Sequence, residues 1–308
     1  MSSEPTLPFA DGPGPIGDLV DPVLVDPSPA LLRAVIDAYR EAAPELVDPT
    51  PSTLRAAESP PAGDSPAPAT DPDSGLPRLA VLASDGAVDA VAERFRLATR
   101  LAALAEAGVC DLLTLREPQP NAALVGRETG CVLVACERRA DGDSGADRTE
   151  AWCRIGDDPA LRERYDPLIE AAEVRRLRAP SRRRVYGSVR DRCGVGLADD
   201  VVRALDADVR GSADRSLDLA GARVRAYAAG VRRGAFDRDL RRAFEDGGLG
   251  SSATFTSIKR DLRAAGVLDT ESVAGSVGRS RDRLVARGAL AEADGPVAAV
   301  AAALAALE

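Results

Sequence analysis

The stretch SSATFTSIKRDLRAAGVLDTESVAGSVGRSRDRLVARG, residues 251–288, decides how the C-terminal half of the chain is organised. Ser252 is a good helix N-cap, because its hydroxyl can accept a hydrogen bond from an unpaired amide of the first turn. Apolar residues then recur on one face at three- and four-residue spacing: Phe255, Ile258, Leu262 and Ala265. Gly266 ends the predicted helix, since glycine adopts the left-handed conformation of a C′ residue without strain.

Two short strand-like runs follow this helix, LDTESVA (268–274) and RDRLVAR (281–287), around the turn sequence GSVGRS. Gly275 and Gly278 permit a tight reversal there. Three arginines at or beside the turn alternate along the chain, so they lie on one side of the ribbon: Arg279, Arg281 and Arg283. The pattern predicts a two-stranded ribbon with an arginine-bearing tip.

Two more helices are predicted directly upstream. Phe236, Leu240 and Phe244 mark the nearer one, which a cluster of glycines ends, and the farther one runs from Asp218 to Val231. Two helices joined by a short glycine-containing turn, the second polar on its outer face, match a helix-turn-helix, and the ribbon would be its wing. We therefore predict an α+β winged helix-turn-helix domain over residues 218–288 and a C-terminal helix over residues 289–308.

The run from Ala253 to Arg279, ATFTSIKRDLRAAGVLDTESVAGSVGR, resembles the winged-helix segment of the TbsP family, transcriptional regulators of halophilic archaea. A weaker similarity extends upstream over most of the chain and includes VLVDPS (23–28) and RFRLAT (94–99). The resemblance implies a regulator that binds DNA through its C-terminal domain.

The outer face of the predicted second helix supplies the candidate DNA contacts. Thr256, Ser257 and Arg260 suit the major groove, where arginine can bond guanine bidentately and hydroxyls can bond bases or phosphate. The flanking cations and the first helical turn would hold phosphates, and the ribbon arginines would enter a groove or clamp the backbone. The full candidate set is Ser252, Thr256, Ser257, Lys259, Arg260, Arg263, Arg279, Arg281 and Arg283. An ordinary three-helix core and a solvated charge run are the alternatives that the pattern leaves open.

Composition divides the chain into an acidic half and a mildly basic half. Residues 1–150 carry 12 basic and 25 acidic residues, and residues 151–308 carry 28 and 24, so only the second half is expected to meet polyanions. Lys259 is the single lysine among 40 basic residues. An acidic surface rich in arginine fits a cytoplasm at very high salt, and a high-GC genome would favour the same residues. At a Debye length of about 3 Å in molar salt, arginines at contact range decide whether DNA binds.

Several function classes lack their residues in this sequence. The five cysteines show no C-x-x-C spacing and the chain has no histidine, so most of the usual zinc ligand sets are missing. Four of the cysteines lie in apolar strand-like runs and are expected to be small core residues. No G-x-S-x-G elbow and no nucleotide-binding glycine loop between a strand and a helix is present. We expect no enzyme activity, metal or cofactor. No uncharged apolar run approaches about 18 residues, so we expect a cytoplasmic protein that does not contact membranes.

The N-terminal half reads as strand–helix–strand–helix–strand, then two or three further strands and a helix. This order predicts an α/β domain with a mixed sheet over residues 22–174, which resembles the ligand-sensing or dimerisation domains of other regulators by analogy only. One long helix is predicted from Asp85 to Ala107, with Gly108 as its stop. Residues 1–21 and 44–77 are rich in Pro, Gly, Ala, Ser and Asp, so we expect a disordered lead-in and a flexible insertion.

Four polar residues follow the predicted strand ends, where ligands of open α/β sheets bind: Asp26, Ser28, Ser84 and Asp85. Helix capping and turn formation are the alternative role for all four. Residues 175–217 are predicted to form a basic linker (Arg175–Cys193) and a connecting helix (Leu197–Val209). The linker arginines either contact phosphates or are simply solvated.

The sequence as a whole predicts a homodimeric transcriptional regulator with double-stranded DNA as partner and a small-molecule effector. Dimerisation is expected because a single helix-turn-helix module reads few base pairs. The alternative is a winged-helix adaptor that binds protein and never DNA. For a third class, a small-molecule enzyme, the sequence shows no set of catalytic residues.

Overall fold

A computed structural model describes residues 4–9, 12–58, 75–138, 147–157, 159–208, 218–274 and 280–308. The chain divides into two compact units. The first, which we call the sheet unit, is drawn from residues 1–47, 66–92 and 104–177. The second, the helical unit, is drawn from residues 48–65, 93–103 and 178–308.

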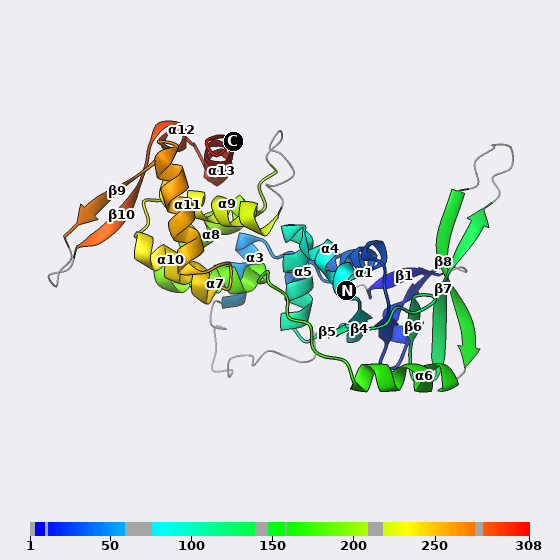
Figure 1. Ribbon diagram of the computed structural model, residues 1–308. Coiled ribbons are helices and arrows are strands. Elements are labelled where there is room, and N and C mark those ends of the chain that lie inside the picture. The colour runs from blue at the N-terminus through cyan, green and yellow to red at the C-terminus, as the bar shows by residue number, and fades with distance from the viewer. Residues whose placement is uncertain are drawn as a thin grey trace, which may run out of the picture. The chain divides into compact units, whose positions relative to one another are not determined.

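The sheet unit is built on an eight-stranded mixed sheet in the order β2-β1-β8-β7-β6-β3-β4-β5 (Figure 1). Its strands are β1 (Thr6–Phe9), β2 (Gly12–Pro15), β3 (Val23–Val25), β4 (Leu79–Ala83), β5 (Cys110–Thr114), β6 (Ala123–Val125), β7 (Thr129–Arg138) and β8 (Asp147–Asp157). The three strands β3, β4 and β5 are parallel, whereas β6, β7 and β8 pair antiparallel beside them. The predicted mixed sheet, parallel first and antiparallel beyond, is confirmed.

Helices of the sheet unit connect and cover these strands. α1 (Pro29–Ala42) and α2 (Pro44–Val47) lie between β3 and β4 in the chain, and α4 (Asp85–Ala92) follows β4. Right-handed crossovers between neighbouring parallel strands place α1 and α4 on the same face of the sheet. α6 (Pro159–Glu170) packs Tyr165 into a cluster of strand residues: Val23, Val25, Leu82, Ala123 and Val125.

The expectation of disorder over residues 1–21 is wrong for the part of that segment that the structure describes. β1 and β2 form an antiparallel hairpin, and the 3-10 helix η1 (Ile16–Asp18) follows it. Leu7 and Ile16 are buried, so two apolar side chains anchor a segment whose overall composition is typical of disorder.

The flexible insertion predicted at residues 44–77 is also partly wrong. α2 and α3 (Pro51–Glu58) occupy residues 44–58, and residues 59–74 lie outside the described part of the chain. Leu54 is almost fully buried. The single long helix predicted from Asp85 to Ala107 is instead two helices, α4 and α5 (Phe95–Glu106). The break falls at residues 93–94, where the chain passes from the sheet unit to the helical unit.

The helical unit contains the three predicted C-terminal helices and more. From residue 178 onward, the elements of this unit are α7 (Arg182–Cys193), α8 (Val195–Leu205), α9 (Leu219–Arg232), α10 (Asp237–Asp246), α11 (Ser252–Ala264), β9 (Leu268–Val273), β10 (Arg281–Ala286), α12 (Gly288–Ala291) and α13 (Pro296–Ala305). The antiparallel ribbon of β9 and β10 projects from the helices (Figure 1), and α13 packs against α9. The predicted helix pair, ribbon and C-terminal helix are all present.

The helix predicted at Leu197–Val209 is present as α8, whereas the basic linker predicted at Arg175–Cys193 is wrong for the part that forms α7. Val185, Tyr186 and Val189 of α7 are fully buried, so this helix belongs to the core of the helical unit. Its arginines alternate with that apolar stripe, which is why a charge count alone indicated a solvated segment.

Distant acidic residues hold these elements together. Arg182 of α7 is buried and pairs with Asp48 and Asp206. Arg55 of α3 donates to Asp199 of α8 at 2.6 Å. Residues 48–58 therefore form part of the helical unit although they lie far from it in the sequence.

Other expectations concern cysteines, metals and membranes. Cys110 and Cys131 are buried as predicted, Cys153 and Cys193 are only half-buried, and the side chain of Cys136 lies outside the described residues. Among the described residues, no group of three or more potential metal-ligating side chains is arranged to hold an ion. In the same part of the chain, every helix is too short or too polar to cross a membrane.

Candidate nucleic-acid interface

α11 is capped by Ser251, not by Ser252 as predicted. The Ser251 hydroxyl accepts a hydrogen bond from the Thr254 amide at 3.2 Å, and Ser252 is the first helical residue. Two adjacent serines offer the same cap chemistry, and only the backbone conformation selects between them. Gly266 ends the helix with φ +74°, the left-handed conformation that the sequence predicts.

The apolar face of α11 is locked into the helical unit. Phe255, Ile258 and Leu262 are buried. The Phe255 ring lies 4.7 Å from Phe244 of α10 and 6.0 Å from Tyr227 of α9, measured between ring centroids. One aromatic side chain thus joins all three helices of the helix-turn-helix core.

The opposite face of α11 is polar and exposed, as predicted. The side chain of Arg260 is 75% exposed, and its guanidinium donates to the Ser257 hydroxyl at 3.1 Å and pairs with Asp261 at 3.0 Å. Arg263 is exposed one turn further on and lies 3.7 Å from Asp269 of β9. Ser257 and Arg260 are therefore brought together at the centre of the exposed face.

Arg241 of α10 organises the start of the same face. Its guanidinium donates to the hydroxyl of Ser252 at 2.9 Å and to that of Thr256 at 3.1 Å. The Thr256 hydroxyl also donates back to the Ser252 carbonyl at 2.9 Å. These bonds hold the first turn of α11 against α10 and restrain the side chains of Ser252 and Thr256.

Lys259 points into the unit, away from this face. Its ammonium donates to Asp237 at 3.0 Å, and its side chain is only 15% exposed. Asp237 also accepts from the Tyr227 hydroxyl at 2.7 Å and pairs with Arg241. We call Asp237, Tyr227, Lys259 and Arg241 the buried network; it joins α9, α10 and α11.

Charge and hydrogen bonding set the protonation of the buried network. Burial works to raise the pKa of Asp237, but the hydrogen bonds from Tyr227 and Lys259 and the charge of Arg241 outweigh it, so the pKa lies below its ordinary value. Burial and the Asp237 charge raise the pKa of Tyr227. The network is therefore a carboxylate held by a neutral phenol and two cations at neutral pH.

Arg281 and Arg283 lie on one side of the ribbon, as predicted, and that side faces the unit's own helices. Arg281 pairs with Asp239 of α10, and its guanidinium lies 3.9 Å above the ring of Phe236. Arg283 donates to the Gly234 carbonyl at 3.1 Å. Both side chains remain exposed. Arg279 lies outside the described residues.

Sequence reasoning passed over two arginines on α10. Arg238 and Arg242 are exposed and lie four residues apart, so they share one face of the helix. Within the described residues, neither has an ion-pair partner. Arg238 lies between Phe236 and Leu240 of the apolar stripe, and Arg242 lies between Leu240 and Phe244, so helical spacing predicts that both face outward.

The four polar residues at the strand ends of the sheet unit all have structural partners. Ser28 caps α1 by accepting from the Leu31 amide at 3.2 Å, and Ser84 accepts from the Ala87 amide at the start of α4. Asp26 accepts from the Gln119 amide at 2.7 Å, and Asp85 pairs with Arg175 at 2.6 Å. Ser28 and Ser84 therefore take the alternative role of helix capping, whereas Asp26 and Asp85 bind residues that are distant in the sequence.

A cap at Ser28 predicts a small, local loss on substitution. Ser28→Ala should lower the free energy of unfolding by about 1 kcal/mol, because the Leu31 amide loses its acceptor. Denaturant unfolding of the full chain measures this, with Ser28→Asp as the control that keeps a capping oxygen. If Ser28→Asp loses as much unfolding free energy as Ser28→Ala, Ser28 does not act as a cap.

Comparison with known families bears directly on these two units. A family model described as the TbsP-like transcriptional regulator C-terminal HTH domain matches residues 181–303. A second, the TbsP-like N-terminal domain, matches residues 64–180. The chain has a TbsP-like two-domain architecture. No curated protein and no solved structure shows significant similarity to the chain in the same comparisons.

The boundary between the two TbsP-like domains falls at Ser181, whose hydroxyl caps α7 by accepting from the Arg184 amide. The TbsP-like C-terminal domain therefore includes α7 and α8, which the sequence pattern placed in a linker. Residues 181–303 are thus similar to the helix-turn-helix domain of a family described as transcriptional regulators.

Proposed function

We propose that the protein is a sequence-specific DNA-binding regulator that inserts α11 into the major groove, with the ribbon of β9 and β10 as a wing. The exposed face of α11 carries the proposal, because its opposite face is fixed by Phe255 and its first turn is fixed by Arg241. Side chains held on a rigid element can meet base edges without a large ordering cost.

Each part of the interface has a distinct role in this proposal. Ser257 and Arg260 read base edges, Arg260 by a bidentate contact with guanine. Breaking the exposed pair between Arg260 and Asp261 costs little, since exposed ion pairs contribute about 0–1 kcal/mol. Arg263 and the two outward arginines of α10, Arg238 and Arg242, contact phosphates, whereas Lys259 supports the fold from inside.

The wing arginines contribute backbone contacts near the turn between α9 and α10. Arg281 and Arg283 are already oriented there by Phe236 and the Gly234 carbonyl. We further propose that the protein acts as a homodimer, because one module reads few base pairs and a two-fold site doubles them.

A protein-binding adaptor is the second candidate, and one observation favours it. Arg260, Arg263 and Arg281 each have a carboxylate partner, in Asp261, Asp269 and Asp239, which lowers the positive potential of the surface. Footprinting on genomic DNA across salt concentrations up to the molar range separates the two: a protected site supports DNA binding, and none at any salt supports the adaptor.

Substitution of Arg260 tests the proposed base contact. Arg260→Ala should weaken binding to a protected site by about 1–3 kcal/mol and leave binding to random duplex nearly unchanged, because one bidentate base contact is lost. Arg238→Ala is the matched control on α10: it should weaken both to the same degree, as a phosphate contact does. A parallel loss on both DNAs for Arg260→Ala would show that Arg260 only positions the protein.

A further inference from the structure

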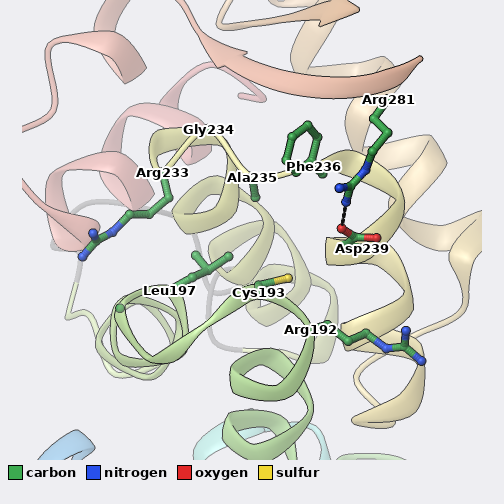
Figure 2. Close-up of a pocket in the computed structure, with 10 residues that line it drawn as sticks. Arg192, Cys193, Leu197, Arg233, Gly234, Ala235, Phe236, Asp239 and Arg281 are labelled. Carbon is green, nitrogen blue, oxygen red and sulfur yellow. Dashed lines mark hydrogen bonds and ion pairs between the residues drawn. The ribbon is translucent and has the colours of Figure 1, made fainter. Parts of the chain in front are cut away.

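A pocket of about 460 Å³ lies in the helical unit, where Arg281, the first residue of β10, meets the helices (Figure 2). Its lining residues come from the end of α7, the first turn of α8, the turn between α9 and α10, the first turns of α10, and β10. Its volume is within the range of pockets that hold small organic ligands, which is about 300–1,000 Å³.

The lining of the pocket is mostly polar, and a smaller apolar part forms its floor. Leu197 and Cys193 lie on one side of it and Ala235 and Phe236 on the other (Figure 2). Burial raises the pKa of the Cys193 thiol to about 11 and the Asp239 charge adds to this, so the thiol is neutral at physiological pH. The floor can therefore take the hydrocarbon part of a ligand.

The rim of the pocket is cationic. Arg192, Arg233 and Arg281 line it, against the single carboxylate of Asp239. Arg192 uses Nε and one terminal nitrogen on Asp246, and Arg233 uses Nε on Asp200. A guanidinium has five N–H donors, so each of these arginines keeps donors for a further anion.

The ion pair between Arg281 and Asp239 suggests the kind of anionic group that the pocket would bind. Arg281 binds the carboxylate of Asp239 at the pocket wall, and both side chains are partly exposed to solvent. Figure 2 shows this pair at the edge of the pocket, with Arg192 on the same side. A guanidinium that already holds a carboxylate there can exchange it for the carboxylate of a ligand.

The first turn of α8 adds backbone donors to the same wall. Gly194 at its N-cap supplies no side-chain acceptor, and Gly196 and Leu197 of that turn line the pocket. Unpaired amides at a helix start favour anions, which reinforces the arginines rather than replacing them.

We propose that this pocket binds a small organic carboxylate with an apolar body, and that the ligand competes with Asp239 for Arg281. Because Arg281 belongs to β10, an occupied pocket would remove one of the contacts that hold the ribbon near the start of α10. The effector site would then lie in the helix-turn-helix domain itself. That regulatory part rests on the proposed DNA binding, whereas the binding of the carboxylate does not.

Alkylation of Cys193 by N-ethylmaleimide reports on the pocket without DNA. Hexanoate at about ten times its dissociation constant should slow the reaction at Cys193 roughly tenfold, as read by peptide mass spectrometry. The half-buried Cys153 of the sheet unit is the internal reference, and its rate should not change. Hexylamine, which has the same body and the opposite charge, should protect neither cysteine.

Two variants test the lining. Gly196→Leu should abolish the protection, because Gly196 has an ordinary backbone φ and the nearest atom to an added Cβ is 3.5 Å away on Arg233, so the leucine fits and fills the pocket. Gly86→Leu, also at the second position of a helix and with open space around it, is the matched control and should keep the protection. Asp239→Asn should tighten hexanoate binding by about two- to fivefold, because a competing charge is removed.

The outcomes separate the site from its regulation. Equal protection of Cys193 in Gly196→Leu and in the unaltered protein, or weaker binding in Asp239→Asn, would overturn the proposed site. If Cys193 is protected but hexanoate leaves affinity for a footprinted DNA site unchanged, the regulatory part is wrong. A protein that binds hexanoate as described and shows no footprint would contradict the proposed function alone.

Discussion

Replacing Asp237 by alanine should lower the free energy of unfolding by about 3 kcal/mol, among the largest effects expected from a single substitution in this protein. The side chain is 5% exposed and is shared by Tyr227, Lys259 and Arg241. Removing one partner of a buried pair leaves the other charge uncompensated, which costs about 3–5 kcal/mol, and the partial exposure of Lys259 favours the lower end.

Denaturant unfolding measures this loss, and the same helix offers a control. Asp239→Ala also removes a carboxylate that pairs with an arginine, but that pair is partly exposed, so the loss should stay within about 1 kcal/mol. Equal losses for Asp237→Ala and Asp239→Ala would contradict the buried network as a source of stability.

The pH dependence of the same variant has a definite sign. The pKa of Asp237 is lower in the folded chain than in the unfolded chain, where it is about 3.9. Its stabilisation is therefore fully present above that value and is lost as pH falls through the lower, folded value. The stability difference between the unaltered protein and Asp237→Ala should be constant near neutral pH and shrink below about pH 4. A difference that does not change with acidification would contradict the assignment.

Phe255→Ala should cost about 3–5 kcal/mol, the range for removal of a fully buried phenylalanine. The ring contacts Phe244 and lies stacked near Tyr227, so its loss leaves a cavity between α9, α10 and α11. Phe255→Leu keeps most of the apolar volume and should lose less than about 1.5 kcal/mol. Denaturant unfolding of both variants checks the prediction. If Phe255→Ala loses less unfolding free energy than Phe255→Leu, the three helices do not depend on this ring.

The sequence predicts the C-terminal helices well because their signals are local. Phe255, Ile258 and Leu262 repeat at helical spacing, and Gly266 needs the left-handed conformation that ends the helix. The parallel strands β3, β4 and β5 are equally clear, since each is a short apolar run bounded by turn residues.

The missed features depend on contacts between distant residues. The arginine-rich composition of α7 predicts a linker, although Arg182 forms an ion pair with Asp48, more than 100 residues earlier. No local pattern shows that Lys259 points inward and binds Asp237, so the sequence alone predicts a phosphate contact for Lys259. Single apolar residues such as Leu7 and Ile16 order a segment whose average composition indicates disorder.

In the candidate site, too, some features can be predicted from local spacing and others depend on contacts between distant residues. Exposure of Arg260 opposite the apolar stripe follows from helical periodicity alone. The bonds from Arg241 to Ser252 and Thr256, and those of Arg281 and Arg283 to the turn between α9 and α10, depend on how α10 meets α11 and the ribbon. Helical or strand spacing carries no information on such packing.

Selection of bound sequences from a random pool of duplex DNA tests the central claim most directly. The full chain should enrich one consensus at salt concentrations up to the molar range, and the Arg260→Ala variant should lose selectivity at one base pair of it while keeping the others. A pool that stays random at every salt concentration would contradict the claim that the exposed face of α11 reads DNA.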